Sequence, residues 1–490
     1  MLLAAFNLLL TFSAFSWVIK LVGSLFLLMG ASASFYMGQY GAVIDVNMLR
    51  NVFETDPAEV IDLLSLKMIF FVLFLGVLPC VLLWITPINY RRFSQELIRK
   101  IIIIVLSAII LIIAAVSNYQ GMSSLFRNHP ELRDMVIPSN IVNASWHYFS
   151  DFFASAAEPF HVIGSDAIRS EQWKQHKRKS LTVIVVGESA RAKNMYLLGY
   201  KRQTNPQLSK AHNLIGFSQV HSCGTETAVS LPCMFSKQTR KQYKPSISNN
   251  QSNLLDLIQR AKIDVAWRDN QSGCKGVCSR VKSVEDVRHS DDDPVICPGG
   301  RCFDEELLKG LKSRLDNLQH DTVLVLHQMG SHGPAYYKRY PNSAKKFKPI
   351  CKSNALNECA TTEVINSYDN TIVYTDAVLA KLIHILQKNA HSVDTAMIYL
   401  SDHGESLGEY NLFLHGTPYV IAPDEQKHIP LLMWFSKSYQ QDFSINMQCI
   451  AKKKDQPYSQ DHLFHSVLSL LQIKTKEYNS ALDIFKGCKK

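Results

Sequence analysis

Uninterrupted apolar stretches occupy much of the first 117 of the 490 residues. A helix needs roughly 17 to 25 predominantly apolar residues to cross a bilayer. Four stretches approach that length, at residues 1–17, 21–40, 68–88 and 101–116. The pattern predicts an N-terminal α-helical transmembrane domain, residues 1–117, with four helices. The first stretch lacks the basic start and the small-residue cleavage site of a signal peptide.

A different pattern begins at residue 181, where short apolar runs alternate with segments of helical periodicity. The apolar runs are VIVVGE, VAW, TVLVLH, TAMIYLS and IPLLMWF, and the helical segments are NLLDLIQRAK, EELLKGLKSRLDNL and YDNTIVYTDAVLAKLIHILQK. Such alternation is typical of a mostly parallel sheet covered by helices on both faces. We therefore expect a C-terminal α/β/α domain over residues 181–490, which is long enough to bury a substantial core.

Residues 118–180 connect the two domains with polar and aromatic sequence. We expect short amphipathic helices near the membrane surface, because aromatic side chains favour the interface between lipid and water. The candidate anchors are Trp146, Tyr148, Phe152 and Phe153. The alternative, that these rings pack on the soluble domain, remains open.

Basic residues predict the orientation, since cytoplasmic loops are enriched in Lys and Arg. The loop 88–100 carries Arg91, Arg92, Arg99 and Lys100. We place this loop in the cytoplasm, which puts the acidic segment 54–62 and the C-terminal domain on the other side of the membrane. The same count puts Met1 outside, and we therefore expect that a native first helix is missing from this sequence.

Ten of the 11 cysteines fall in the C-terminal domain and pair by local spacing, whereas Cys80 lies in a membrane helix. The expected disulfides are Cys223–Cys233, Cys274–Cys278, Cys297–Cys302, Cys351–Cys359 and Cys449–Cys488. Five disulfides fit an oxidising compartment such as the periplasm. The competing interpretation is a structural zinc site made by Cys274, Cys278, Cys297 and Cys302.

Potential ligand side chains follow three of the predicted strands. Glu188 comes directly after one apolar run, and Asp402 and His403 come after another. His327 and His332 follow a third. In an open α/β sheet, ligands bind outside the carboxyl ends of the strands. Oxygen and imidazole ligands at three such ends predict one metal-centred site.

Three hydroxyl groups in the segment HSCGTETAVSLPCMFS are candidate nucleophiles, namely those of Thr225, Thr227 and Ser230. Thr227 precedes a helical pattern, so its hydroxyl would lie at a helix N-terminus, where negative charge is stabilised. A threonine hydroxyl is a poor nucleophile at neutral pH unless a base or a cation activates it. An ordinary capping threonine is the alternative.

Two carboxylates, one imidazole and the threonine oxygen form a four-coordinate set suited to Zn²⁺, from Glu188, Asp402, His403 and Thr227. His332 and His415, in glycine-bounded loops, are suited to hold a phosphate, to protonate a leaving oxygen or to complete a second metal site. Lys275, between two cysteines, is either a fixed charge for a phosphate oxygen or a solvated lysine. His327 is interpreted as a support for its loop.

The residues VVGESAR, SCGTETAVSLPCMFS, GCKGVC, HQMGSHGP, SYDNTIVYTD and YLSDHGESLGE resemble the lipid A phosphoethanolamine transferases of the alkaline phosphatase and sulfatase superfamily. The similarity covers nearly the whole chain. It implies a multi-pass protein of the bacterial inner membrane with a catalytic domain of alkaline phosphatase and sulfatase type in the periplasm. Such an enzyme moves phosphoethanolamine from phosphatidylethanolamine to lipid A.

The resemblance also assigns roles to residues. The second threonine of the family's GTET motif is the nucleophile, which corresponds to Thr227, and one tightly bound Zn²⁺ is implied, with a second ion as an alternative. The implied substrate-binding residues are Ser272, Lys275, His332 and His415, together with Asn51, Thr55 and Glu59, which lie four residues apart on one helical face and would contact the ethanolamine head group. A solvated acidic helix start is the alternative for that face. The family has five membrane helices, whereas four are predicted here.

We therefore expect Thr227 to attack the donor lipid, to release diacylglycerol and to pass phosphoethanolamine from a covalent intermediate to a phosphate group of lipid A. Modified lipid A would carry less negative charge and would attract cationic peptides such as polymyxin less strongly. A core heptose or a periplasmic glucan is the alternative acceptor. We expect a monomer and no nucleic-acid partner.

Three other functions are weighed against this one. A sulfatase would need an arginine in a Cys/Ser-x-Pro-x-Arg motif, where this chain has Met234. A glycerol-phosphate transferase of a Gram-positive cell fits poorly with five disulfides. A sensor or transporter fits the membrane helices alone and would bind no zinc, so a metal assay separates it from the enzyme.

Overall fold

The apolar stretches of the first 117 residues form helices in the structure, which is a computed structural model describing residues 2–54, 60, 61, 63–119, 130–171, 173, 176, 178–291 and 293–489. By its internal contacts the chain divides into two units. One contains Met1–Leu49 and Leu64–His147, and the other contains Arg50–Leu63 and Tyr148–Lys490. We call the first the membrane unit and the second the catalytic-domain unit.

Helices account for most of the described residues before residue 158. They are α1 (Leu2–Phe12), α2 (Ser16–Tyr40), α3 (Val46–Glu54), α5 (Leu66–Val72), the π turn η1 (Leu73–Val77), α6 (Leu78–Ile85), α7 (Phe93–Ser117), the 3-10 helix η2 (Pro130–Met135) and α9 (Ser139–Ala157). Three stretches are long and apolar enough to cross a membrane, namely Ser16–Tyr40, Leu66–Ile85 and Phe93–Ser117.

The first expected span differs from the prediction. Helix α1 has 11 residues, or about 16 Å at 1.5 Å per residue, whereas the apolar core of a bilayer is about 30 Å thick. It is separated from α2 by a short break, in which Phe15, the residue before α2, is extended with φ −110° and ψ 149°. The described part of the chain therefore contains three helices of spanning length and one shorter apolar helix.

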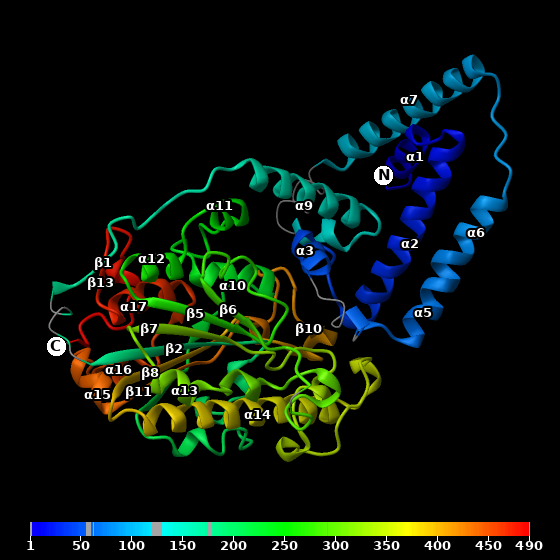
Figure 1. Ribbon diagram of the computed structural model, residues 1–490. Coiled ribbons are helices and arrows are strands. Elements are labelled where there is room, and N and C mark those ends of the chain that lie inside the picture. Colours follow the sequence, from blue (N-terminus) through cyan, green and yellow to red (C-terminus); the bar gives the residue numbers. More distant parts are fainter. Residues whose placement is uncertain are drawn as a thin grey trace. The chain divides into compact units, whose positions relative to one another are not determined.

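The catalytic-domain unit is built on a seven-stranded sheet with the order β3-β11-β8-β2-β7-β5-β6 (Figure 1). These strands are β2 (Lys179–Gly187), β3 (Leu214–Phe217), β5 (Asp264–Asp269), β6 (Ser283–Asp286), β7 (Thr322–His327), β8 (Val393–Ser401) and β11 (Leu431–Phe435). Strands β8, β2, β7, β5 and β6 pair in parallel, and β11 runs antiparallel to its neighbours. The mostly parallel sheet is as predicted.

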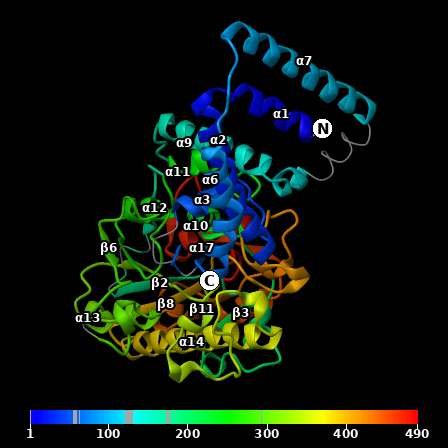
Figure 2. The same cartoon turned by 90° about the vertical axis from the view of Figure 1, so that its right-hand side faces the viewer.

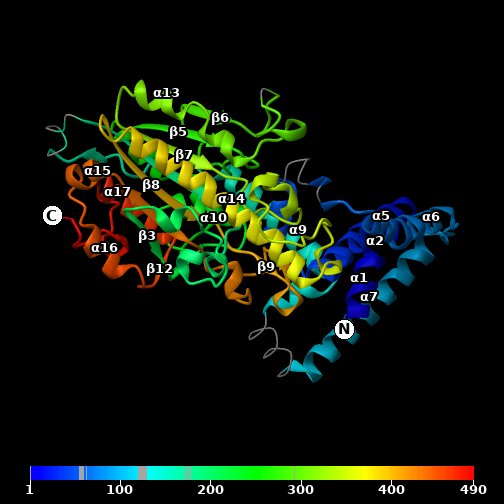
Figure 3. The same cartoon turned by 90° about the horizontal axis from the view of Figure 1, so that it is seen from below.

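Helices cover both faces of this sheet, with α14 across one face and α10, α12 and α17 across the other (Figures 1 and 2). Figure 3, seen from below, shows α14 in front of the strands. The side chains of β2 alternate accordingly. Ile184 and Val186 belong to the core cluster of α10, α12 and α17. Leu181, Val183 and Val185 belong to the cluster of α13 and α14. Burial on both faces explains why the strand reads as a continuous apolar run.

The helices of this unit are α10 (Thr227–Phe235), α11 (Pro245–Asn249), α12 (Leu254–Arg260), α13 (Leu311–Asp316), α14 (Thr361–Lys388), α15 (Lys437–Asp442), α16 (Met447–Lys453) and α17 (Asp461–Leu470). Short strand pairs lie outside the main sheet: β1 (Ile168–Arg169) with β13 (Ile473–Lys474), β4 (Val220–His221) with β12 (Tyr458–Ser459), and β9 (Ser406–Leu407) with β10 (Phe413–Leu414). The expected helix EELLKGLKSRLDNL is divided into η8 (Asp304–Leu308) and α13, because Gly310 takes a positive φ of 72° between them.

Five disulfides join the ten cysteines of the catalytic-domain unit in the expected pairs. The alternative of a structural zinc site made by these cysteines is therefore wrong. Cys274 bonds Cys278 and Cys297 bonds Cys302, so these four residues offer no thiolate to a metal. Cys80 is the free cysteine among the described residues.

Helix α9 carries the aromatic residues expected to act as interfacial anchors. Trp146, Phe152 and Phe153 are exposed, whereas the ring of Tyr148 stacks on Phe53 at 4.9 Å. Exposed aromatic rings on one helix are compatible with the interfacial interpretation, which stays a prediction.

Candidate metal centre and active site

The carboxyl ends of two adjacent strands bring three ligand side chains together. Strands β2 and β8 pair in parallel, with Gly187 opposite Ser401. Glu188 directly follows β2, and Asp402 and His403 directly follow β8. The amide of Asp402 donates to the Gly187 carbonyl at 2.9 Å, which continues the pairing beyond the strand ends. The expected placement at the edge of the sheet is observed.

Glu188, Asp402 and His403 each offer a ligand atom, and these atoms all lie within 4.8 Å of one another. His403 Nε2 is 3.4 Å from Glu188 Oε1 and 3.4 Å from Asp402 Oδ2. All three side chains have 0% exposure. Charged groups buried to this degree are costly unless they are paired or bind a metal.

The orientation of His403 suits a metal ligand. Its Nδ1 lies 2.8 Å from the Gly404 carbonyl, which can only accept a hydrogen bond. Nδ1 therefore carries the proton, and the lone pair of Nε2 faces the two carboxylates and Thr227. Fixing the tautomer through the second ring nitrogen is how proteins commonly orient metal-binding histidines.

The two carboxylates have opposite pKa shifts. Burial raises the pKa of Glu188, but the electrostatic influence of the neighbouring imidazoles of His403, His332 and His415 outweighs it and lowers this pKa below its ordinary value. Burial and the neighbouring Glu188 carboxylate raise the pKa of Asp402 to about 6. Among the described residues no hydrogen-bond donor reaches the buried Asp402 Oδ2. An acceptor oxygen without a donor, beside a second carboxylate, fits a divalent cation with oxygen and nitrogen ligands.

The hydroxyl of Thr227 completes this cluster. Thr227 is the first residue of α10, and its Oγ1 donates to Glu188 Oε2 at 3.0 Å and lies 3.3 Å from His403 Nε2. The two other candidate nucleophiles are engaged elsewhere. Thr225 donates to the Thr417 carbonyl, and Ser230 accepts from the Gly224 amide. Thr227 is thus the hydroxyl of this segment that the structure brings to the ligand cluster.

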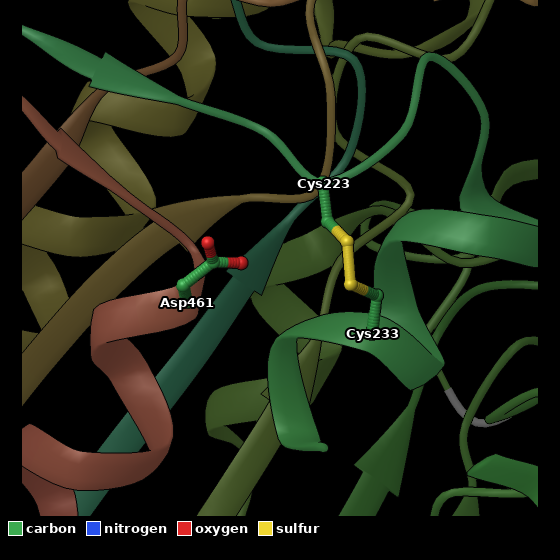
Figure 4. Close-up of side chains that lie close together, drawn as sticks. All are labelled: Cys223, Cys233 and Asp461. Atoms are coloured by element: carbon green, nitrogen blue, oxygen red, sulfur yellow. A yellow bond between two sulfur atoms is a disulfide. The ribbon is translucent and has the colours of Figure 1, made fainter. Parts of the chain in front are cut away.

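A disulfide ties the loop before Thr227 to the helix that follows it. Cys223 bonds Cys233 on α10, and Asp461 at the start of α17 lies beside this bond (Figure 4). Asp461 accepts a hydrogen bond from the Arg240 amide. Because both sulfurs are oxidised, the group is a structural link, and it holds the beginning of α10 in place.

Gln271 is a site residue that the sequence analysis missed. Its Nε2 donates to Glu188 Oε2 at 2.8 Å, and its backbone amide is fixed by Asp269, the last residue of β5. Asp269 also accepts from His327 at 3.0 Å. His327 was expected to support its own loop, whereas the structure places it against Asp269, which fixes the loop after β5. The position of Gln271 two residues after a strand was the available signal.

Lys275 and Ser272 lie on the same loop after β5. Lys275 Nζ donates to Ser272 Oγ at 3.2 Å, and Lys275 sits inside the Cys274–Cys278 disulfide with a φ of 46°. The rings of His332 and His415 are 5.9 Å apart, and His415 is 4.3 Å from His403. The two imidazoles expected to hold a phosphate therefore adjoin the ligand cluster.

Glu405, also missed from sequence, is a fully buried carboxylate whose Oε2 lies 3.2 Å from His415 Nδ1. Burial lowers the pKa of His415, but Glu405, Glu188 and Asp402 outweigh it and raise the pKa to about 9. In the sequence DHGE, residues 402–405, only Asp402 and His403 were predicted to be site residues.

Arg191 connects the loop after β2 with the loop after β8. Its Nη1 donates to the Glu405 carbonyl at 2.9 Å, and its Nη2 donates to Glu409 Oε1 at 2.7 Å. Tyr368 on α14 accepts from the Arg191 amide and donates to the Ser189 carbonyl. These bonds hold the two ligand-bearing loops against each other, and we call Arg191, Tyr368 and Glu409 the loop brace.

Three residues were expected to contact the ethanolamine head group, and the structure describes one of them. Asn51 lies on α3. Thr55 and Glu59 lie outside the described residues, so their proposed contact with ethanolamine stays a prediction.

Comparison with known proteins identifies the same architecture. A sulfatase family model matches residues 180–473, and a model described as phosphoethanolamine transferase EptA/EptB matches residues 2–153. The phosphoethanolamine transferase EptA of Escherichia coli K12 is 43% identical over 490 residues, covering 99% of this chain and 88% of that protein. The phosphatidylethanolamine transferase Mcr-1 of Escherichia coli is 38% identical and covers 87% and 80%.

A solved structure agrees with these relatives. The integral membrane lipooligosaccharide phosphoethanolamine transferase A of Neisseria meningitidis superposes with a TM-score of 0.93 at 37% identity, covering 98% of this chain and 89% of that one. The fold and the site thus define a membrane protein with a periplasmic-type catalytic domain of the sulfatase and alkaline phosphatase superfamily. The chain belongs to the family of lipid A phosphoethanolamine transferases.

Proposed function

We propose that this chain transfers phosphoethanolamine from phosphatidylethanolamine to a phosphate group of lipid A, through a covalent intermediate on Thr227. The observation that carries the proposal is the position of the Thr227 hydroxyl, 3.0 Å from Glu188 and 3.3 Å from His403. We place the enzyme in the bacterial inner membrane as a multi-pass monomer, with its catalytic domain in the periplasm. The lipooligosaccharide named for the Neisseria meningitidis relative supports a lipid-anchored acceptor.

Glu188, Asp402, His403 and Thr227 would hold one Zn²⁺. The ion would supply Lewis-acid chemistry, which lowers the pKa of a bound hydroxyl and stabilises negative charge on a phosphoryl group. The donor set fits this ion because two carboxylate oxygens and one oriented imidazole nitrogen converge.

In the first step Thr227 Oγ1 bonds to the phosphorus of the donor, and the bond from phosphorus to the diacylglycerol oxygen breaks. The hydroxyl proton leaves Thr227 along its hydrogen bond to Glu188 Oε2, and the diacylglycerol oxygen takes up one proton, so the step has no net proton change. His332 and His415 are placed to hold the phosphoryl oxygens and to deliver that proton. The start of α10 stabilises the charge that develops beside Thr227.

In the second step an oxygen of the acceptor phosphate bonds to the same phosphorus, the bond to Thr227 Oγ1 breaks, and Thr227 regains a proton. A core heptose or a periplasmic glucan would offer a hydroxyl in place of the phosphate. The product would carry less negative charge on lipid A, which supports resistance to polymyxin and other cationic peptides.

Mass spectrometry of lipid A from cells that express the chain tests this proposal. We expect an added phosphoethanolamine mass with the wild type, none with Thr227→Ala, and an unchanged addition with Thr239→Ala, whose hydroxyl contacts Gln242 after α10. Polymyxin resistance should likewise be present with the wild type and Thr239→Ala and absent with Thr227→Ala. Unmodified lipid A from cells that contain well-expressed, membrane-inserted wild type would contradict the proposed acceptor.

A further inference from the structure

A cavity of about 350 Å³ adjoins two of the loops that carry residues of the candidate site. It is lined by the loop that the Cys297–Cys302 disulfide closes, by residues 337–340, and by Asn270 and Met329. Its described lining residues include none of the residues expected to bind the substrate, namely Ser272, Lys275, His332 and His415. The cavity is therefore separate from the site around Thr227, and its volume lies in the range of small-molecule sites.

The cavity carries an excess of positive charge. Its cationic side chains are Arg288, Arg301, Lys338 and Arg339. Asp304 is the carboxylate among the described lining residues, and its oxygens accept from the Asn270 side chain and from two backbone amides. Arg288 also pairs with Asp286, which is not part of the lining. Four cations against these two carboxylates leave two positive charges, and such a cavity attracts an anion.

The chemistry of the lining suits a phosphate group on a sugar. Arg301 and Arg339 carry guanidinium groups, which match phosphate oxygens with two parallel hydrogen bonds. Lys338 Nζ lies 5.9 Å from the ring centroid of Tyr337. The rings of Phe303, Tyr337 and Tyr340 offer apolar surface to a sugar ring, beside the cations that would bind its phosphate.

Two parts of the lining are bonded to residues of the candidate site. Arg339 is 7% exposed, and its Nε donates to the His332 carbonyl at 2.8 Å. Asn270 directly precedes Gln271, whose side chain donates to Glu188 at 2.8 Å. A ligand that contacts Arg339 and Asn270 therefore restrains the segments that carry His332 and Gln271. Such a restraint couples the two sites, and the coupling is reciprocal.

We propose that this cavity is a second anion-binding site of the catalytic-domain unit, and that its ligand is a phosphate monoester carried on a sugar ring. Two sources offer this chemistry. One is a second phosphate group of the acceptor lipid, and the other is a free sugar phosphate. The binding site stands apart from the proposed function, whereas the first source rests on it.

Equilibrium dialysis with radiolabelled glucosamine 1-phosphate tests the site in the full chain, held in lipid nanodiscs without donor lipid. We expect two molecules bound per wild-type chain. The double variant Arg301→Ala and Lys338→Ala should lose the molecule in the cavity, because its affinity falls by about 10- to 100-fold, the range for lost charge-assisted hydrogen bonds. Lys275→Ala, at the site around Thr227, should keep the molecule in the cavity.

A matched control separates this effect from a general change of charge. The double variant Lys312→Ala and Arg314→Ala removes two ion-paired cations of α13, so its net charge changes by the same amount. It should still bind two molecules. Thermal unfolding of both double variants should show that each is folded.

Transfer assays distinguish the two sources. If the acceptor lipid supplies the group, lipid A with two phosphate groups should have a KM about 10-fold below that of lipid A with one, as expected for one charge-assisted hydrogen bond. This difference should disappear in Arg301→Ala and Lys338→Ala. Equal KM values in the wild type would assign the cavity to the free sugar phosphate.

Two dialysis results would overturn the inference. One is unchanged binding in the folded double variant Arg301→Ala and Lys338→Ala, and the other is a wild type whose single bound molecule is lost in Lys275→Ala. A wild type that transfers no phosphoethanolamine would contradict the proposed function instead, and the count of bound molecules would still stand.

Discussion

Two buried carboxylates about one imidazole are the chemical centre of this protein. Burial and the neighbouring Glu188 carboxylate raise the pKa of Asp402 to about 6, and both side chains have 0% exposure. Near neutral pH two buried negative charges therefore lie side by side, and a divalent cation would pair with both of them. The charges of the site therefore favour a bound cation.

Replacing Asp402 by asparagine should release the metal. Asp402→Asn removes a charged ligand, so we expect zinc affinity to fall by at least about 100-fold, measured as zinc per protein after dialysis against chelators of graded strength. Asp376→Asn is the matched control, because Asp376 on α14 is equally buried, its pKa is also raised to about 6 by burial, and it binds the Gln207 and Leu208 amides. Equal zinc loss in both variants would contradict the assignment.

His465 should lower the free energy of unfolding of the folded protein at acidic pH. The ring lies in α17, where burial and the nearby His462 lower its pKa to about 4. A pKa below the unfolded value of about 6.5 stabilises the fold fully above pH 6.5, and this stabilisation is lost as the pH falls towards 4.

The free energy of unfolding should therefore fall between pH 7 and pH 5. His465→Asn, which keeps an acceptor for the Asn479 amide, should reduce that fall by about 1 kcal/mol, allowing for solvent screening. Denaturant titrations at the two pH values provide the measurement. A fall that is identical in wild type and variant would show that other groups are responsible.

At the scale of elements, the site depends on loops that are held by bonds remote from the chemistry. The loop brace connects the segments that carry Glu188 and Asp402, and Asp269 fixes the segment that carries Gln271. Asp304 on η8 accepts from the amides of Met329 and Gly330, and so fixes the loop that leads to His332. Ligands on such loops keep their spacing only if these bonds are intact.

Removal of the loop brace should weaken the metal site without unfolding the domain. Arg191→Ala removes the donor to Glu409 Oε1 and to the Glu405 carbonyl, so we expect about 3 to 5 kcal/mol of lost stability and a 10- to 100-fold lower zinc affinity. Thermal unfolding and zinc titration would measure the two effects.

Arg178→Ala is the control for this variant. It breaks an ion pair with Asp394 at the amino end of the sheet, so it should cost stability without changing zinc affinity. If Arg191→Ala binds zinc as tightly as wild type, the brace does not position the ligands.

At the scale of the whole molecule, three observations support the proposed export of the catalytic domain of this membrane protein. Three helices have spanning length, the loop 88–100 is basic, and five disulfides lie in the catalytic-domain unit. Apolar side chains of α7 are largely exposed, as expected for a helix surrounded by lipid.

Single introduced cysteines would test the sidedness. In spheroplasts, a membrane-impermeant maleimide should label Lys312→Cys, at an exposed position on α13, and should label Asn89→Cys only after the membrane is permeabilised. The wild type, whose free Cys80 is buried, should stay unlabelled. Labelling of Asn89→Cys in intact spheroplasts would reverse the proposed orientation.

Much of the fold was predictable because its signals are local in sequence. The buried strands appear as apolar runs, and the disulfides join cysteines that are mostly four to ten residues apart. The helix break at Gly310 and the end of α1 before Phe15 were not predicted, because a positive φ or an extended residue interrupts a favourable composition. The antiparallel course of β11 was also missed, since strand direction leaves no mark in composition.

The sequence by itself determined which chemical groups are available, because Glu188, Asp402 and His403 each directly follow an apolar strand, and strand ends of a parallel sheet share one edge. The helical pattern after Thr227 and the family resemblance also favoured this hydroxyl over those of Thr225 and Ser230. Only the tertiary structure decided which histidine tautomer faces these groups and which partners hold them, and the packing of α10 brings Thr227 to Glu188. Gln271 and Glu405 became visible for the same reason: their roles arise from contacts with segments that no local pattern records.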